Sequence, residues 1–255
     1  MTTAARRYGR DGEDAIALVT GGGRGIGQAC AMALADDGVT IVVADIDGDA
    51  ARETVAAIEG AGGRASAIEC DVSDESSSAV GVQAVVDRYG QLDCAVNAAG
   101  IVVPTSGLSG SDWDIEVFDR IIAVNLRGVM LSVKHELVPM LARGSGSIVN
   151  IASAAAFIGV PGGVAYTASK HGVVGVTRAA ALEHAASGVR INAVCPGGVR
   201  TRMLAGFEDL QGPTHPVGRL AEPMEIATAV RWLCSSDSSF VVGAAILVDG
   251  GITAQ

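Results

Sequence analysis

Short apolar runs alternate with longer amphipathic stretches along the 255 residues of the chain. The runs are rich in Val, Ile and Ala without regular polar alternation, which is typical of strands buried on both faces. Seven runs are predicted as strands, at residues 15–20, 40–44, 65–70, 92–97, 147–152, 189–195 and 244–248. Apolar residues at helical spacing predict helices between most of them, one directly after a glycine turn at 21–25 and others beginning near Gly48, Asp74, Ser111, Val164 and Pro223.

Strands that alternate with helices predict right-handed crossovers and a parallel sheet that is covered on both faces. The fold class expected is therefore α/β, a Rossmann-like, doubly wound sheet of about seven strands. No internal repeat, long linker or break in composition divides the chain. We expect one domain over residues 14–255, preceded by a flexible tail over residues 1–13.

Composition and charge exclude several classes of partner and site. A net charge of −10 disfavours nucleic acid and anionic membrane surfaces, which attract clustered Lys and Arg. The five cysteines are scattered and the four histidines lack metal-ligand spacing, so neither disulfides nor a metal site is expected. With no run of 18 apolar residues and no signal-peptide pattern, we expect a cytoplasmic protein.

The stretch "TGGGRGIG" connects the first predicted strand to a helix. Its glycines permit positive φ angles and close approach, and the first helical turn presents unpaired N–H groups that suit a phosphate. The general G-x-G-x-x-G pattern is absent, whereas T-G-x-x-x-G-x-G fits Thr20, Gly21, Gly25 and Gly27. An ordinary tight turn before a helix is the alternative interpretation.

Polar residues come after other predicted strands, at the sheet edge where doubly wound folds bind ligands. Asp45 lies 18 residues beyond Gly27, where a carboxylate can accept hydrogen bonds from an adenosine ribose, although a solvated aspartate fits as well. The sequences "CDV" and "NAAG" end the third and fourth strands and could line an adenine and a ribose.

A candidate catalytic group comes after the fifth strand. Ser153 ends "NIAS", and Tyr166 and Lys170 are four residues apart and so share one helix face. To act as a base near pH 7, a tyrosine needs its pKa lowered by about three units, or roughly 4 kcal/mol. Lys170 together with the charge of an oxidised nicotinamide could supply this at about 4 Å and an effective dielectric near 20. A Tyr and Lys pair on the surface of a helix, without a catalytic role, is the alternative.

Eight motifs in order resemble the short-chain dehydrogenase/reductase family: "TGGGRGIG", "CDV", "NAAG", "VNLRG", "NIAS", "YTASK", "VCPGGVRT" and "LVDGG". The resemblance extends from about Ala15 to Gly251, with Ala98 where the family commonly has a second Asn. It implies that Tyr166 is the general acid/base and that Lys170 lowers its pKa and holds the ribose. It also implies that Ser153 binds the substrate oxygen.

The resemblance further implies that Asn125 positions a water that links Lys170 to solvent, and that the cofactor is a nicotinamide dinucleotide. The carboxylate of Asp45 favours NAD, although Arg24 is a basic residue in the glycine turn. The expected cofactor-binding residues are Gly21, Arg24, Gly25, Ile26 and Gly27, then Asp45, Asp71, Val72, Asn97, Ala98 and Gly100, and finally Tyr166, Lys170, Pro196, Gly197, Val199 and Thr201.

The expected activity is reversible hydride transfer between NAD(H) and a secondary alcohol or ketone. A 3-oxoacyl-[acyl-carrier-protein] reductase is the nearer alternative, and a non-catalytic nucleotide-sensing module is a remote one. The resemblance implies a homotetramer and a substrate-covering segment at residues 202–221. Met203, Leu204 and Phe207 are among its apolar members, which suggests a compact, moderately apolar substrate.

Overall fold

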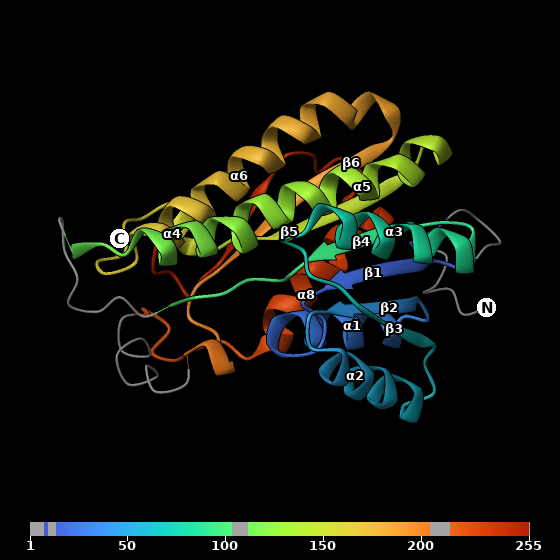
Figure 1. Cartoon of the computed structure of the whole chain (residues 1–255), viewed down its shortest axis with the longest axis horizontal. Coiled ribbons are helices and arrows are strands. Elements are labelled where there is room, and N and C mark those ends of the chain that lie inside the picture. Colours follow the sequence, from blue (N-terminus) through green and yellow to red (C-terminus); the bar gives the residue numbers. More distant parts are fainter. Residues whose placement is uncertain (1–7, 10–13, 104–111, 205–214, 255) are drawn as a thin grey trace.

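The structure is a computed structural model that describes residues 8–9, 14–103, 112–204 and 215–254. Seven parallel strands form one sheet in the order β3-β2-β1-β4-β5-β6-β7, which confirms the predicted fold class (Figure 1). The strands are β1 (Ile16–Thr20), β2 (Thr40–Asp45), β3 (Ala65–Glu69), β4 (Cys94–Asn97), β5 (Gly146–Ile151), β6 (Val189–Pro196) and β7 (Ala245–Val248).

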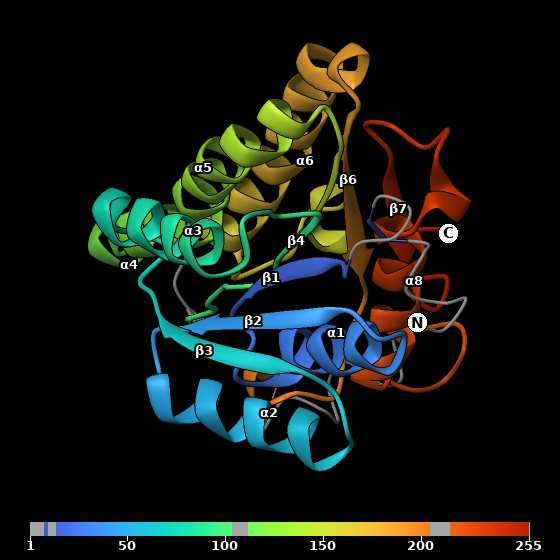
Figure 2. The same ribbon diagram turned by 90° about the vertical axis from the view of Figure 1, so that its right-hand side faces the viewer.

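Helices cover both faces of the sheet, so the molecule has three layers (Figure 2). One layer consists of α1 (Gly25–Asp36), α2 (Gly48–Gly60) and α8 (Pro223–Cys234). The other consists of α3 (Glu75–Tyr89), α4 (Ile115–Ile122), α5 (Gly128–Arg143) and α6 (Val164–His184). Among the described residues, no helix combines the length and apolar content needed to cross a membrane.

Two hydrophobic cores lie between these layers, and neighbouring side chains of one strand enter opposite cores. In β1, Ala17 and Val19 pack in the core that includes α1 and α8, while Ile16 and Leu18 pack in the core that includes α5 and α6. Alternation of direction along a strand requires this arrangement. Since both faces are buried, β1 has a continuous apolar sequence rather than an alternating one.

Aspartates define the starts of three helices. Asp47, Asp74 and Asp114 each accept a hydrogen bond from the backbone N–H three residues on, at 3.0, 2.7 and 3.1 Å. Such side chains satisfy N–H groups that have no partner inside the helix. The cap at Asp114 places the start of α4 at Ile115, later than the start expected near Ser111.

The helix predicted to begin near Ser111 consists of three helical segments in the structure: α4, a π-helical turn and α5. Between α4 and α5, residues Ala123–Arg127 form a π-helical turn, and Asn125 is buried within it. Wider turns of this kind often occur at functional sites, because they turn a side chain away from the regular helical repeat. Nothing in the hydrophobic pattern indicates this turn.

The expected flexible tail and the expected substrate-covering segment of the domain are only partly described. In the expected flexible tail, Tyr8 is buried and its hydroxyl donates to Asp37, so this residue packs against the domain. In the expected substrate-covering segment, Arg202–Leu204 forms a short 3-10 helix. Phe207 lies outside the described residues.

Candidate active site

A cavity of about 340 Å³ lies at the carboxyl ends of the strands and contains residues from many of the predicted motifs. It collects side chains and backbone from segments that are far apart in sequence, because parallel strands end at the same edge of the sheet. The predicted site residues that line it are Ile26, Ala98, Gly100, Ser153, Tyr166, Lys170, Pro196, Gly197, Val199 and Thr201.

Ser153 and Tyr166 line this cavity together, and the Ser153 side chain acts to lower the pKa of Tyr166. Ser153 comes directly after Ala152 at the end of β5, where its hydroxyl accepts the N–H of Ala155 at 3.1 Å. Tyr166 lies in the first turn of α6. A serine and a tyrosine hydroxyl in one cavity can together bind one substrate oxygen, with the tyrosine exchanging a proton with it.

Lys170 lies one turn after Tyr166 and is only 5% exposed. Its ammonium group donates to the carbonyl of Ile151 at 2.9 Å and lies 5.6 Å from the centre of the Tyr166 ring. Burial lowers the pKa of Lys170 to about 8, because a charged amine loses solvation inside the protein. The predicted pairing of Tyr166 and Lys170 on one helix face therefore exists in the fold.

The pKa of Tyr166 differs from the expectation that Lys170 lowers it. Burial raises this pKa above its ordinary value, and the hydrogen bond from Ser153 opposes the rise. The desolvation of the phenolate is the larger of the two effects. The residues of this chain therefore do not by themselves prepare Tyr166 as a base.

Asn125 is buried and tied to the segment after β4. Its Oδ1 accepts the N–H of Ile101 at 2.8 Å, and its Nδ2 donates to the carbonyl of Ile101 at 2.9 Å and to Ser169 Oγ at 3.3 Å. A carbon added to Gly100 would lie 3.4 Å from Asn125 Oδ1 and 3.8 Å from Lys170 Nζ. Both side chains therefore border the same point beside Gly100.

The turn between β1 and α1 requires glycine at several positions, because a side chain there would be strained or would clash with the backbone. Gly21 and Gly25 have φ angles of +63° and +56°, which residues with a Cβ seldom adopt. A Cβ on Gly27 would lie 2.1 Å from the carbonyl oxygen of Gly21. Arg24, the N-cap of α1, makes no side-chain capping bond, and the first turn of α1 has no acidic residue. This turn fits a phosphate group that approaches the start of α1.

Asp45 stands at the end of β2 beside this turn. Its carboxylate accepts the N–H of Gly23 at 2.9 Å and the N–H of Asp47 at 3.0 Å. Arg24, the basic residue of the turn, contacts Asp47 at 3.3 Å and Glu53 at 3.5 Å. Arg24 could have attracted the 2′-phosphate of NADP, but its guanidinium group already forms ion pairs with Asp47 and Glu53.

The remaining predicted residues lie outside the cavity lining. Asp71 accepts the N–H and hydroxyl of Ser73 at 2.9 and 2.7 Å, and Val72 is buried. The amide of Asn97 points into the core and donates to Asn150 Oδ1 at 2.9 Å and to Glu136 Oε2 at 3.1 Å. Only the main chain of Asn97 remains for a ligand.

Apolar walls enclose the cavity, and Met203 and Leu204 from the expected substrate-covering segment belong to them. Large apolar lining residues that the sequence motifs do not indicate include Val102, Val103, Ile121, Ile158, Val160, Pro161 and Ile252. Among the described lining residues, Lys170 alone carries a charged side chain. The segments that supply most of this wall are loops and a chain end, for which hydrophobic periodicity gives no prediction.

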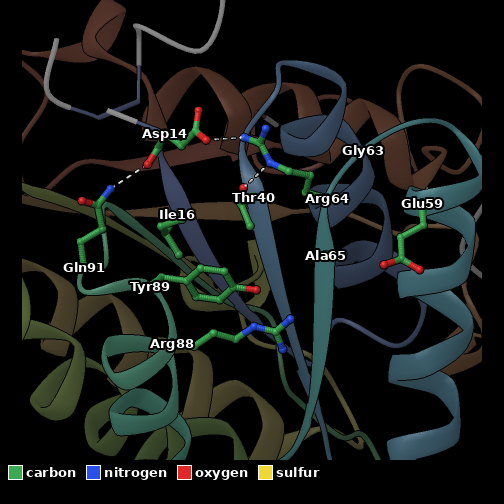
Figure 3. Close-up of a pocket in the computed structure, with 10 residues that line it drawn as sticks. All are labelled: Asp14, Ile16, Thr40, Glu59, Gly63, Arg64, Ala65, Arg88, Tyr89 and Gln91. Carbon is green, nitrogen blue, oxygen red and sulfur yellow. Dashed lines mark hydrogen bonds and ion pairs between the residues drawn. The ribbon is translucent and has the colours of Figure 1, made fainter. Parts of the chain in front are cut away.

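A wider and more open hollow, of about 670 Å³, lies at the opposite edge of the sheet, beside the first residues of β1, β2 and β3 (Figure 3). Its polar groups largely bind one another. Arg64 contacts Asp14 at 3.1 Å and Thr40 at 3.0 Å, and Gln91 donates to the carbonyl of Asp14 at 2.7 Å. None of the predicted site residues lines this hollow.

Comparison with known proteins agrees with the geometry. The family model described as Enoyl-(Acyl carrier protein) reductase matches residues 21–253. The chain is 42% identical over 241 residues to cyclohexanol dehydrogenase of an Acinetobacter species, covering 94% of this chain and 95% of that protein. It is 42% identical over 245 residues to 2,5-dichloro-2,5-cyclohexadiene-1,4-diol dehydrogenase of Sphingobium indicum, covering 93% and 96% of the two chains.

A solved structure has the same fold over its whole length. The crystal structure of a short-chain type dehydrogenase/reductase from Mycobacterium marinum superposes with a TM-score of 0.92 at 33% identity, covering 99% of this chain and 100% of that one. With the family model matching nearly the whole chain and the relatives matching over most of theirs, this protein belongs to the short-chain dehydrogenase/reductase family.

Proposed function

We propose that this protein transfers a hydride reversibly between NAD(H) and a compact, uncharged secondary alcohol or its ketone, with Tyr166 as general acid/base. The protein is an oxidoreductase that acts on CH–OH groups, as its dehydrogenase relatives are. The observation that carries the proposal is the meeting of Ser153, Tyr166 and Lys170 in one apolar cavity that Ile26, from the first turn of α1, also lines.

In the proposed mechanism, the substrate oxygen binds between the hydroxyls of Ser153 and Tyr166, which line the same cavity. Tyr166 accepts the hydroxyl proton during oxidation and returns it during reduction. A bound nicotinamide would take or give the hydride at the neighbouring carbon. The apolar walls exclude water from the reacting atoms, which strengthens the interactions of these two hydroxyls with the substrate.

Lys170 and Asn125 support Tyr166 in this proposal. With an oxidised nicotinamide bound, the ammonium group of Lys170, held by the carbonyl of Ile151, would add its charge to that of the cofactor in favouring the phenolate form of Tyr166, and it would hold a ribose hydroxyl. Because Asn125 and Lys170 border the same point beside Gly100, a water there could pass protons from Lys170 toward solvent. Asn125 also fixes the segment after β4 through its two bonds to Ile101.

NAD rather than NADP is proposed as the cofactor. Asp45 places a carboxylate beside the glycine turn, where it would bind a free 2′-hydroxyl and repel a 2′-phosphate. Arg24, which could have favoured the phosphate, is accompanied by Asp47 and Glu53. The fit of the glycine turn to a pyrophosphate holds for either cofactor, so Asp45 carries the distinction.

The size and character of the cavity support a compact apolar substrate. A volume of about 340 Å³ that must also admit the nicotinamide ring leaves room for a small ring rather than a long chain. Both relatives named above are dehydrogenases of six-membered-ring alcohols. An acyl-carrier-protein substrate is less supported, because the net charge of −10 repels an acidic carrier.

A panel of alcohols tests the proposed function. With NAD⁺, cyclohexanol and a cyclic diol should produce reduced nicotinamide absorbance, whereas a sugar should not, since its additional hydroxyls would be buried against apolar walls without partners. Acetoacetyl thioester with NADH and NADPH is the control for the carrier-protein alternative. Reduction of the thioester without oxidation of any ring alcohol would overturn the proposal.

Assembly and location are proposed as well. Exposed apolar side chains on α5 and α6 support a homotetramer, in which a second copy of the chain would cover them: Met130 and Val138 on α5 and Leu182 on α6 are 53%, 67% and 81% exposed. The five cysteines are all free and buried, which accords with the reducing conditions of the cytoplasm.

A further inference from the structure

His215 is buried where two segments of the candidate site meet. It lies in the expected substrate-covering segment and is 4% exposed. On one side it faces the loop after β6, and on the other it packs against the chain after β7, where its Cβ lies within 3.6 Å of the position that a Cβ on Gly250 would occupy. No motif of the family pattern pointed to this residue.

The imidazole ring accepts a hydrogen bond from the backbone. The N–H of Gly198 donates to His215 Nε2 at 2.8 Å. Gly198 is itself buried, so solvent does not replace this partner easily. A buried N–H without an acceptor is unfavourable, and the loop would move to let this group find another partner.

The contact leaves no space between the ring and the loop. A Cβ on Gly197 would lie 2.8 Å from His215 Nε2 and 2.8 Å from the carbonyl oxygen of Asp249. Gly197 is therefore enclosed between the His215 ring and the chain after β7. The N–H of Val217 donates to the carbonyl of Gly250 at 3.2 Å and fixes the second side of this arrangement.

Both segments held by His215 line the candidate active-site cavity. Gly197, Gly198 and Val199 belong to the loop after β6, and Ile252 belongs to the chain after β7. We propose that His215 is a positioning residue: by accepting the Gly198 N–H, it fixes the loop of residues 196–201 in the conformation that receives the nicotinamide end of the cofactor. This inference rests on the proposed function.

Two ligands separate positioning of this loop from a general effect on the fold. NADH contains the nicotinamide, whereas ADP-ribose lacks it and keeps the adenosine, the pyrophosphate and the second ribose, which would face Asp45, the glycine turn and Lys170. In His215→Leu the acceptor is lost, so NADH binding, measured by fluorescence titration, should weaken about tenfold. ADP-ribose binding, measured by calorimetry, should stay within about twofold of wild type, because Gly198, the partner of His215, would lie at the nicotinamide end rather than at the glycine turn.

His215→Gln is the matched control, because its side-chain oxygen reaches the place of Nε2 and can accept the same N–H. It should retain most of the NADH affinity. His215→Asn, which is polar but too short to reach Gly198, should behave like His215→Leu and serves in its place if the leucine variant does not fold.

The outcomes distinguish this inference from the proposed function. Equal weakening of NADH and ADP-ribose in His215→Leu or His215→Asn, or no weakening of either, would overturn the inference while the proposed function stands. Failure of His215→Gln to restore NADH binding would overturn it too. A wild-type protein that binds neither ligand would overturn the proposed function, and this inference with it.

Discussion

The surroundings of Tyr166 oppose its action as a base, because they raise its pKa. Burial raises its pKa, and only the hydrogen bond from Ser153 opposes the rise within the chain. Lys170, although it is close, is itself desolvated, and its pKa is lowered to about 8. The two shifts have one cause, which is the apolar character that makes the cavity suitable for an alcohol and unsuitable for isolated charges.

Tyr166→Phe should separate chemistry from binding. The substitution removes one oxygen from the cavity, so NADH should bind with nearly wild-type affinity while turnover falls by roughly 10² to 10⁴-fold, the usual contribution of a positioned proton-transfer group. Fluorescence titration and steady-state kinetics on a ring alcohol that the wild type oxidises provide the measurements. Wild-type turnover in this variant would contradict the assigned role.

Lys170→Ala is the companion variant. Unlike Tyr166→Phe, it should weaken NADH binding in addition to slowing turnover. The rate of alcohol oxidation in the wild type should rise with pH as Tyr166 ionises, and the loss of the ammonium group should move that ionisation to higher pH. A pH profile that is the same in both proteins would show that Lys170 does not act on Tyr166.

At the residue scale, Asp45 is the side chain that we propose selects NAD over NADP. Wild-type protein should bind NADH more tightly than NADPH, and Asp45→Ala should narrow the gap by removing the charge that repels a 2′-phosphate, a repulsion of about several kcal/mol at close range. Asp49→Ala is the control: Asp49 pairs with Arg52 on α2, and its substitution removes the same charge farther from the turn. Tighter binding of NADPH by the wild type would contradict the assignment.

At the scale of elements, burial and local capping could be predicted from the sequence. The run containing Ala17 and Val19 reads as a strand because both faces are covered, and Asp74 marks the start of α3 because its side chain caps it. The predicted fourth strand was two residues too long. Asp93 lies before β4 and accepts the N–H of Ile16 through its side chain, a contact that no local pattern encodes.

In the candidate site, too, some residues could be predicted from local sequence and others could not. Ser153, Tyr166 and Lys170 could be predicted because their spacing in short motifs repeats a geometry of strand ends and helix turns. The apolar wall, including Ile252, and the contact between His215 and Gly198 could not, since loops that are distant in sequence form them. The sequence also could not predict that the Asn97 amide points into the core, because its partners Glu136 and Asn150 lie on other elements.

Glu136 on α5 is a buried carboxyl group that the proposed mechanism does not use. One oxygen accepts from Asn97, while within the described structure the other, Oε1, has no hydrogen-bond partner. Beside it lies a space of about 10 Å³, also lined by Ser78 and Ser132, which is close to the size of one water molecule. Burial raises the pKa of Glu136 from 4.5 to about 8.

This shift predicts how stability depends on pH. Between about pH 4.5 and 8 the folded protein keeps the proton of Glu136 and the unfolded chain has lost it, so stability falls as pH rises through this range. The slope from this group is at most about 1.4 kcal/mol per pH unit. The free energy of unfolding in urea should be measured for wild type and Glu136→Gln at fixed protein concentration. From pH 5 to pH 8 the value for Glu136→Gln should rise relative to the value for the wild type.

Glu116→Gln provides the control for losing one carboxylate, because Glu116 is exposed on α4. Its stability should change with pH as that of the wild type does across the same range. Parallel pH profiles for wild type and Glu136→Gln would mean that Glu136 does not hold its proton in the folded state.

At the scale of the whole molecule, the exposed apolar face of α5 and α6 favours association. Leu182, 81% exposed on α6, would be covered if a second copy packed its own α5 and α6 against these helices. Leu182→Glu would bury an unpaired charge in that interface, which costs several kcal/mol. Light scattering at micromolar concentration should therefore find wild-type tetramers and smaller species for this variant.

Val80→Glu is the matched control for that experiment. Val80 is 67% exposed on α3, which is outside the proposed interface, so the same new charge there should leave the tetramer intact. Because association adds to the stability of the folded chain, Leu182→Glu should also lose thermal stability that depends on protein concentration, whereas Val80→Glu should not. A monomeric wild type, or equal behaviour of the two variants, would contradict assembly through α5 and α6.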